Sequence, residues 1–359
     1  MADKTKPHHT PEGFRNNYPT PPRGSFWKWQ QERREKGLPR VPPGGYHFPL
    51  HHPDVARLHA NRSEPTLTWL GHSTFLLQIA GLNLLTDPHL TERASPLNFA
   101  GPRRVVPPAL SLKQLPHIDA VLVSHNHYDH LDYSTVRRLS RQAAGSPMFF
   151  VPLGLKGWFA GHGMRDVIEL DWWEQAEHRG LRFHLCPVQH WSARTAWDRD
   201  KTLWGGWMVE HWEGARHEPA FRFFFAGDTG YSRDFLDIAA RFAPIDLAAL
   251  PIGAYEPRWF MQVMHINPEE AVRIHQDLRA RYSVAMHWGT FVLTDEPLDE
   301  PPHKLAAARR AAGVPAEHFF VMQHGETRDL KPLMRHREQS PAAGHAPAHQ
   351  PAAPANGSL

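Results

Sequence analysis

Cysteine and long apolar runs are almost absent from this chain of 359 residues. The single cysteine, Cys186, excludes an internal disulfide framework and a zinc site built from thiolates. Cys186 precedes Pro187 without an evident base, and no Gly-x-Ser-x-Gly motif occurs, so a protein nucleophile is not indicated. No run of 18 apolar residues exists, and residues 1–14 have no apolar core. We therefore expect no transmembrane helix, no signal peptide and a cytoplasmic location, soluble or peripherally attached to a membrane.

Charge is unevenly distributed along the chain. Residues 1–40 contain nine basic and four acidic residues, whereas residues 41–330 contain 28 basic and 32 acidic residues, a net charge of −4. A surface that follows nucleic-acid phosphates needs clustered Lys and Arg on the folded body, so we expect no nucleic-acid partner. Two interpretations of the basic N-terminal segment stay open: contact with an anionic membrane surface, or a solvated, poorly ordered arm.

Composition predicts three regions. Residues 1–54 are rich in Pro, His and Arg and indicate an extended arm with one short helix near 28–36. Residues 55–330 indicate the catalytic domain. Residues 331–359 are rich in Pro and Ala, which predicts a disordered tail.

The middle region alternates short β-type runs with amphipathic helical runs. Expected strands cover residues 66–70, 75–79, 82–86, 120–124, 182–188, 207–209, 221–226, 247–252, 283–286 and 318–322. Expected helices cover residues 133–144, 233–242, 268–280 and 304–312, with Asp132 and Asn267-Pro268 as start signals. Twice, a set of strands is followed by strand–helix units, which predicts an α+β fold with two packed sheets and helices outside.

A histidine-rich motif follows the expected strand at 120–124. It reads His125-Asn126-His127-Tyr128-Asp129-His130 and places four metal-capable side chains within six residues. Imidazole and carboxylate are ligands that zinc and similar divalent metals prefer. The alternative, a polar loop that is rich in His because the chain has 27 of them, does not explain the matching partners downstream.

Three further candidate ligands also follow expected strands: His190, Asp228 and His287. Together with the motif they make seven ligands, enough for two metal ions. One ion would be held by His125, His127 and His190, the other by Asp129, His130 and His287, with Asp228 as a bridge.

This ligand set resembles that of the metallo-β-lactamase superfamily. Asp87, in Leu84-Leu85-Thr86-Asp87-Pro88, also matches that superfamily's early Asp, which usually supports the site. Longer blocks between about residue 66 and about residue 328 resemble one family more closely, the phospholipases D that hydrolyse N-acylphosphatidylethanolamine. These blocks lie at residues 86–88, 93–96, 118–121, 124–131, 151–155, 169–174, 223–231, 251–261, 268–275 and 287–291.

The resemblance implies an αββα sandwich of two β-sheets flanked by helices, with two divalent metal ions, zinc being the best match. It implies hydrolysis of N-acylphosphatidylethanolamine to N-acylethanolamine and phosphatidate by a hydroxide held between the metals. The substrate would be a phospholipid at a membrane surface or in a micelle, and the enzyme a possible homodimer.

Several further residues have predicted roles. The predicted catalytic residues are Asp129 and His265, the latter for phosphate contact or proton delivery; a capping His before a helix is its alternative. Tyr128, Trp259 and Phe260 are predicted substrate contacts, although Trp259 and Phe260 also suit ordinary core packing. His72 and Asp87 are predicted to support the site.

Two other functions would use the same ligands. A hydrolase of this fold could act on another phosphodiester or on a lactone, because fold does not fix substrate. A metal-binding structural or sensing protein without turnover is the second rival, and metal content without any activity would favour it.

Overall fold

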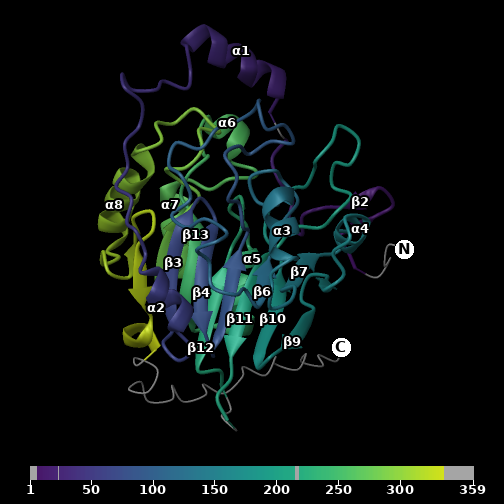
Figure 1. The fold of residues 1–359 in the computed structure, drawn as a ribbon. Coiled ribbons are helices and arrows are strands. Elements are labelled where there is room, and N and C mark those ends of the chain that lie inside the picture. Colours follow the sequence, from purple (N-terminus) through teal and green to yellow (C-terminus); the bar gives the residue numbers. More distant parts are fainter. Residues whose placement is uncertain (1–5, 23, 215–217, 335–359) are drawn as a thin grey trace, which may run out of the picture.

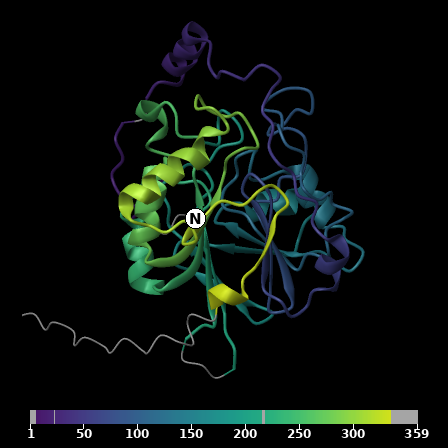
Figure 2. The ribbon, with the colours of Figure 1, turned by 90° about the vertical axis from the view of Figure 1, so that its left-hand side faces the viewer.

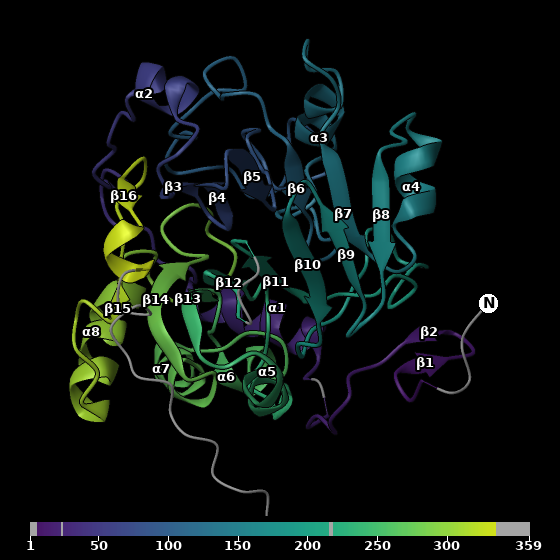
Figure 3. The same cartoon turned by 90° about the horizontal axis from the view of Figure 1, so that it is seen from below.

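The computed structural model describes residues 6–22, 24–214 and 218–334, which form two seven-stranded β-sheets packed face to face (Figure 1, Figure 3). The tail expected over residues 331–359 lies, from residue 335 onward, outside these ranges. The division into an arm, a domain from 55 to 330 and a tail stays a prediction. Within the described ranges, no helix has both the length and the apolar character needed to cross a membrane.

The first sheet has the strand order β16-β3-β4-β5-β6-β7-β8. Its strands are β3 (Thr66–Gly71), β4 (Thr74–Ile79), β5 (Leu82–Thr86), β6 (Ala120–Leu122), β7 (Met148–Pro152), β8 (Val167–Leu170) and β16 (Thr327–Asp329). Neighbours are antiparallel from β16 to β5 and parallel from β5 to β8. Helices α2 (Val55–Ala60), α3 (Tyr133–Leu139) and α4 (Lys156–Gly161) lie on its outer side (Figure 3).

The second sheet has the order β15-β14-β13-β12-β11-β10-β9. Its strands are β9 (Gln175–His178), β10 (Leu181–Cys186), β11 (Gly206–His211), β12 (Phe221–Phe225), β13 (Ile245–Pro251), β14 (Ala280–Met286) and β15 (Phe319–Phe320). Pairing is antiparallel from β9 to β12 and parallel from β12 to β15. Helices α5 (Asp234–Phe242), α7 (Pro268–Asp277) and α8 (Glu300–Ala312) cover its outer face, and the short α6 (Arg258–Met261) follows β13.

The side chains of a strand point alternately to the two faces of its sheet, and this alternation explains why the first sheet is covered on both faces. In β6, Ala120 and Leu122 pack into the core between the sheets, whereas Val121 packs into a second core under the helices of the first sheet. In β7, Phe150 joins the first core and Phe149 the second. Because successive side chains of a strand point to opposite faces, an apolar strand of this kind needs cover on both faces. Figure 2 shows the result edge-on, with the yellow-green helices of the second half on one side and the blue helices of the first half on the other.

The predicted sandwich is confirmed, and so are two helix starts. Asp132 accepts a hydrogen bond from the backbone of Ser134 at the start of α3, and Asn267 forms a capping box with Glu270 at the start of α7. Several predicted bounds were wrong: α3 ends at Leu139 rather than at residue 144, α7 ends at Asp277 rather than at residue 280, α8 begins at Glu300 rather than at residue 304, and β15 has only two residues. Gln142 turns back to pair with both backbone groups of Ile118, which closes the segment after α3 onto the sheet.

The N-terminal segment is packed against the sandwich. It contains a short hairpin of β1 (His9–Thr10) and β2 (Gly13–Phe14), followed by α1 (Phe26–Lys36). The predicted short helix is therefore present, two residues longer at its start than expected. Its Trp29 is buried against Phe260 of α6, and α1 lies above α6 in Figure 1.

Candidate metal centre

The loop after β6 carries the histidine-rich motif as a tight turn. Backbone N–H groups of His130 and Leu131 both donate to the carbonyl of His127. The imidazoles of His125 and His130 are buried, and the side chain of Asp129 is 16% exposed. A short strand followed by this turn is what lets neighbouring residues converge on one point.

Three imidazole nitrogens form a first group. The Nδ1 atom of His127 lies 2.8 Å from Nε2 of His125 and 3.3 Å from Nε2 of His190, which follows β10. Burial lowers the pKa of His125 well below its usual range and lowers the pKa values of His127 and His190 to about 3. All three rings are therefore neutral at ordinary pH, the form in which imidazole binds metals.

A second group contains Asp129, His130 and His287. The Oδ2 atom of Asp129 lies 3.3 Å from Nε2 of His130 and 3.5 Å from Nε2 of His287, which follows β14. Strands from both sheets thus contribute to one site, as the order of motifs along the chain predicts.

Asp228 lies between the two groups. Its carboxylate oxygens are 3.1 Å from Nε2 of His130 and 3.1 Å from Nε2 of His287. The same carboxylate is 4.0 Å from Nε2 of His125 and 3.9 Å from Nε2 of His190. A single carboxylate in this position can be shared by two cations.

Unpartnered buried atoms test whether these residues fit metal ions. Nε2 of His130, Nε2 of His287 and Oδ1 of Asp228 are buried without a hydrogen-bond partner among the described residues. Buried polar atoms are normally paired, and adjacent lone pairs of this kind are ones that a metal ion would satisfy. The donor set therefore fits metal ions.

Charge balance supports the same conclusion. Burial alone would raise the pKa of Asp228, but the positive charge of His130 and His287 outweighs it and holds that pKa well below its usual range. Burial would lower the pKa of His287, yet Asp228 and Asp129 raise it to about 9. The carboxylates thus require positive charge beside them, which a metal ion would supply in exchange for the imidazole protons.

Asp87 supports the motif from behind. It accepts hydrogen bonds from the backbone N–H and hydroxyl of Ser124, at 2.7 and 2.5 Å, and from Nδ1 of His130 at 2.6 Å. Nδ1 of His125 lies 2.9 Å from the same hydroxyl. These bonds fix the ring of His130 with Nε2 turned to the site, a common arrangement at metal centres.

His72 is the second predicted supporting residue. Its Nε2 atom lies 3.1 Å from Oδ2 of Asp129, and its ring centre is 4.1 Å from that of His287. The backbone N–H of His72 donates to the hydroxyl of Thr290, and its carbonyl accepts from the backbone of His287. His72 therefore connects a carboxylate of the site to the segment that carries His287.

His265 faces the site from the segment after α6. Its Nδ1 atom is 3.8 Å from Oδ2 of Asp228 and has no hydrogen-bond partner among the described residues. Its ring lies between those of His190 and His287, at 5.3 and 5.6 Å. Burial lowers the pKa of His265 to about 3, against the opposing effect of Asp228.

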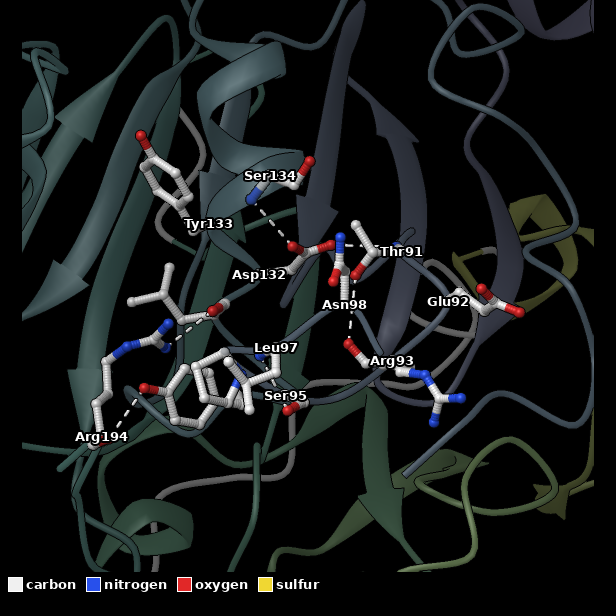
Figure 4. Close-up of a pocket in the computed structure, with 13 residues that line it drawn as sticks. Thr91, Glu92, Arg93, Ser95, Leu97, Asn98, Asp132, Tyr133, Ser134 and Arg194 are labelled. Carbon is white, nitrogen blue, oxygen red and sulfur yellow. Dashed lines mark hydrogen bonds between the residues drawn. The ribbon is translucent and has the colours of Figure 1, made fainter. Parts of the chain in front are cut away.

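A pocket of about 270 Å³, drawn in Figure 4, adjoins the histidine-rich motif, of which Tyr128 is the member that lines it. Tyr133 and Arg194 lie on one side of it, and Glu92 and Arg93 on the other. The pocket is lined by residues 91–93, 95–98, 128, 131–134 and 194.

Arg194 is a residue that the sequence did not reveal. Its guanidinium donates to the carbonyls of Asn126 and Leu131, at 2.7 and 2.9 Å, and lies 4.0 Å from the ring centre of Tyr128. It therefore ties the loop after β10 to the histidine-rich motif. Its only signal in the sequence is its position four residues after His190.

Trp259 and Phe260, the other two predicted substrate contacts, pack against the N-terminal segment. Phe260 is buried and stacks on Trp29, with ring centres 5.0 Å apart, and Lys28 Nζ lies 4.8 Å from the ring centre of Trp259. A substrate contact by Phe260 would require Trp29 to move.

A separate cluster combines His8, His9 and Asp171. Nε2 atoms of His8 and His9 lie 2.7 and 2.8 Å from the two carboxylate oxygens of Asp171, and Lys6 Nζ lies 2.7 Å from one of them. Asp171 also accepts from the backbone of Trp172. Its carboxylate is thus fully used by donors, and we interpret the cluster as an ion-pair anchor for the N-terminal segment.

Comparison with known proteins gives consistent matches. A family model described as Beta-lactamase superfamily domain matches residues 82–288. N-acyl-phosphatidylethanolamine-hydrolyzing phospholipase D 1 of Caenorhabditis elegans is 44% identical over 251 residues, 66% of this chain and 68% of that protein. The mitochondrial enzyme of the same name from Saccharomyces cerevisiae is 39% identical over 244 residues, 66% of this chain and 50% of that protein.

Solved structures agree on the fold. Igni18, a metallo hydrolase from the archaeon Ignicoccus hospitalis, superposes with a TM-score of 0.55 at 23% identity, covering 74% of this chain and 98% of that one. At this identity the similarity concerns the fold alone.

Proposed function

Because the chain belongs to the β-lactamase superfamily and, within it, to the family of N-acylphosphatidylethanolamine-hydrolysing phospholipases D, we propose that it hydrolyses N-acylphosphatidylethanolamine. The reaction would cleave the phosphodiester bond on the side of the N-acylethanolamine and leave phosphatidate. Two metal ions would be required, and the imidazole and carboxylate ligands suit zinc.

The observation that carries this proposal is the shared carboxylate. Asp228 lies within 4.0 Å of nitrogen atoms from both ligand groups, whose buried lone pairs face one another. His125, His127 and His190 would hold one ion, and Asp129, His130 and His287 the other.

Metal ions bound there would supply a nucleophile by making water acidic near neutral pH and would neutralise charge that grows on the phosphoryl oxygens. Side chains of the protein position these groups. Asp228 keeps the two groups at a fixed separation, and Asp129 is held by the hydrogen bond from His72. Asp87 orients His130 in the same way.

His265 is the candidate for contact with the phosphoryl group. Its ring is neutral, because its pKa is about 3, and it stands at the edge of the site with an unpartnered nitrogen. A neutral imidazole donates a hydrogen bond from its N–H without giving up a proton. We therefore favour phosphate contact over proton delivery for His265.

Tyr128 is the candidate for contact with the rest of the substrate. It lines the pocket of about 270 Å³ that adjoins the motif, whereas Trp259 and Phe260 belong to a separate apolar cluster with Trp29. A phospholipid substrate, attachment to a membrane surface, a homodimer and a cytoplasmic location stay predictions.

Product analysis by mass spectrometry tests the proposal. Metal-loaded protein would be incubated with N-acylphosphatidylethanolamine in mixed micelles, beside a chelated sample and the Asp228→Asn variant. We expect N-acylethanolamine and phosphatidate from the loaded protein only.

Absence of product from a protein shown to hold two metal ions would overturn the lipid assignment and leave the metal centre standing. Other phosphodiesters and lactones would then be the substrates to examine.

A further inference from the structure

The N-terminal segment reaches the metal centre through one side chain. Asn16 lies two residues after the β1–β2 hairpin, and its amide contacts the backbone of His190, 174 residues further along the chain. Nothing in the ligand motifs points to residues 6–18 as part of the site.

The two residues form a reciprocal pair of hydrogen bonds. The backbone N–H of His190 donates to Oδ1 of Asn16 at 3.0 Å, and Nδ2 of Asn16 donates to the carbonyl of His190 at 3.1 Å. Oδ1 of Asn16 also accepts from the indole N–H of Trp204 at 3.1 Å. Within the described ranges, the N–H and the carbonyl of His190 make no hydrogen bonds other than these two with Asn16.

The ring of His190 is held independently. Its Nδ1 atom lies 2.9 Å from the carbonyl of Met264, which places the proton on Nδ1 and leaves the lone pair of Nε2 directed to His127 and Asp228. The direction of that lone pair also depends on where the backbone of His190 sits. The backbone of the preceding residue, Gln189, is bonded to Thr229 and Gly230, and Asn16 holds the N–H and carbonyl of His190 itself.

The hairpin before Asn16 is fixed to the same loop. Gly13 has φ of +151°, and a Cβ atom there would come within 2.1 Å of the carbonyl of Asp200, so only glycine permits this approach. The backbone N–H of Phe14 donates to that carbonyl at 2.8 Å. Asp200 in turn donates its backbone N–H to the carbonyl of Ser192. The segment is therefore docked on the loop of residues 190–204 before Asn16 reaches His190.

We propose that Asn16 is a positioning residue of the metal centre: it holds the backbone of His190 so that this imidazole completes the first ligand group. The inference rests on the metal-binding part of the proposed function and not on the lipid substrate. On this proposal, the N-terminal segment contributes to metal binding through Asn16.

Metal affinity, measured by competition with a chromogenic chelator, tests the inference without any substrate. Asn16→Leu keeps the forked shape of the side chain, with two methyl groups larger than the amide atoms they replace, and removes all three hydrogen bonds. The matched control is Asn17→Leu, because the neighbouring Asn17 donates to Asp234 at 2.9 Å and its side chain makes no hydrogen bond to residues 190–204 among the described residues. Supporting residues at metal sites typically contribute 10–100-fold to affinity. We expect Asn16→Leu to weaken one of two bound ions about tenfold and Asn17→Leu to leave both unchanged.

Cobalt substitution adds a signature that a purely structural role would not alter. The visible absorption of Co²⁺ in the first ligand group should change in Asn16→Leu and stay as in the wild type in Asn17→Leu. Asn16→Asp keeps the acceptor for the N–H of His190 but turns a carboxylate oxygen toward the carbonyl of His190, so it should recover only part of the affinity that Asn16→Leu loses. Asn16→Ala removes the same bonds and replaces Asn16→Leu if that variant does not fold.

Wild-type affinity and an unchanged cobalt spectrum in Asn16→Leu would overturn the inference. Equal losses in Asn17→Leu would also overturn it, because docking of the segment in general would then be the cause. An Asn16→Asp variant no better than Asn16→Leu would remove the N–H of His190 as the relevant contact. Failure of the wild type to bind metal would instead overturn the proposed function itself.

Discussion

Two clusters of histidine and aspartate in this molecule have nearly the same composition but different roles, one as a candidate metal site and the other as an ion-pair anchor. His130, His287 and Asp228 lie at the metal centre, and His8, His9 and Asp171 anchor the N-terminal segment. Both clusters are buried, and in both a carboxylate faces two imidazoles. Residue type alone therefore does not distinguish a metal site from an ion-pair anchor.

The two clusters differ in whether their buried polar atoms have hydrogen-bond partners. In the anchor, nitrogen-to-oxygen distances of 2.7 and 2.8 Å are those of hydrogen bonds, and Lys6 supplies a permanent positive charge. At the metal centre two nitrogen-to-oxygen distances are 3.1 Å, within the range of a hydrogen bond, but Nε2 of His130, Nε2 of His287 and Oδ1 of Asp228 make no hydrogen bond among the described residues. The polar atoms of the anchor are thus paired with one another, whereas those of the metal centre suit a bound cation.

The largest expected effect comes from exchanging one carboxylate in each cluster. Asp228→Asn removes the charge shared by both ligand groups, so we expect loss of bound metal and a fall in turnover of at least about a hundredfold, since even supporting residues contribute 10–100-fold. Asp171→Asn should keep two metal ions per chain. Metal content by mass spectrometry of the purified proteins, with the activity assay, measures both.

Full metal retention with a normal rate in Asp228→Asn would remove this residue from the site. Metal loss in Asp171→Asn would show that our distinction between the two clusters is wrong.

A smaller effect should follow from His265, which borders the metal centre without belonging to either ligand group. His265→Ala should lower turnover about a hundredfold, the lower limit for a side chain that acts on a reacting group, and leave both metal ions bound. The matched control is His59→Ala, an exposed histidine in α2. An unchanged rate in His265→Ala would return this residue to a structural role.

The fold and the ligand positions could be read from the sequence because both depend on local patterns. Each candidate ligand directly follows an apolar run, and the carboxyl ends of such strands meet at one edge of the sheets. Asp132 and Asn267 mark helix starts through side chains that bond within three residues. Patterns between residues this close together in the chain can be recognised in a single sequence.

Contacts between distant segments could not be read in this way. Asn16 meets His190 across 174 positions, and Arg194 meets Asn126 across 68. The strand β9 has alternating exposed and half-buried residues and little apolar content, so its place in the sheet depends on pairing with β10. Nor does the pair His8-His9 differ in sequence from a metal-binding pair; only Lys6 and the distances to Asp171 separate the two interpretations.

The smallest effect concerns stability and its dependence on pH. Asp171→Asn leaves the donors Lys6, His8 and His9 facing an amide, and we expect a loss of about 1–3 kcal/mol in the free energy of unfolding at pH 7. Burial alone would raise the pKa of Asp171, but hydrogen bonds from His8 and Lys6 outweigh it and hold that pKa below its ordinary value of 3.8. A depressed pKa means that the stabilisation is complete above the unfolded-state value and disappears as the pH falls through the folded-state value. Urea unfolding of both proteins from pH 7 to pH 3 should therefore give a constant difference down to about pH 4 and a shrinking one below it. A difference that persists undiminished at pH 3 would mean that the carboxylate charge of Asp171 is not what anchors the segment.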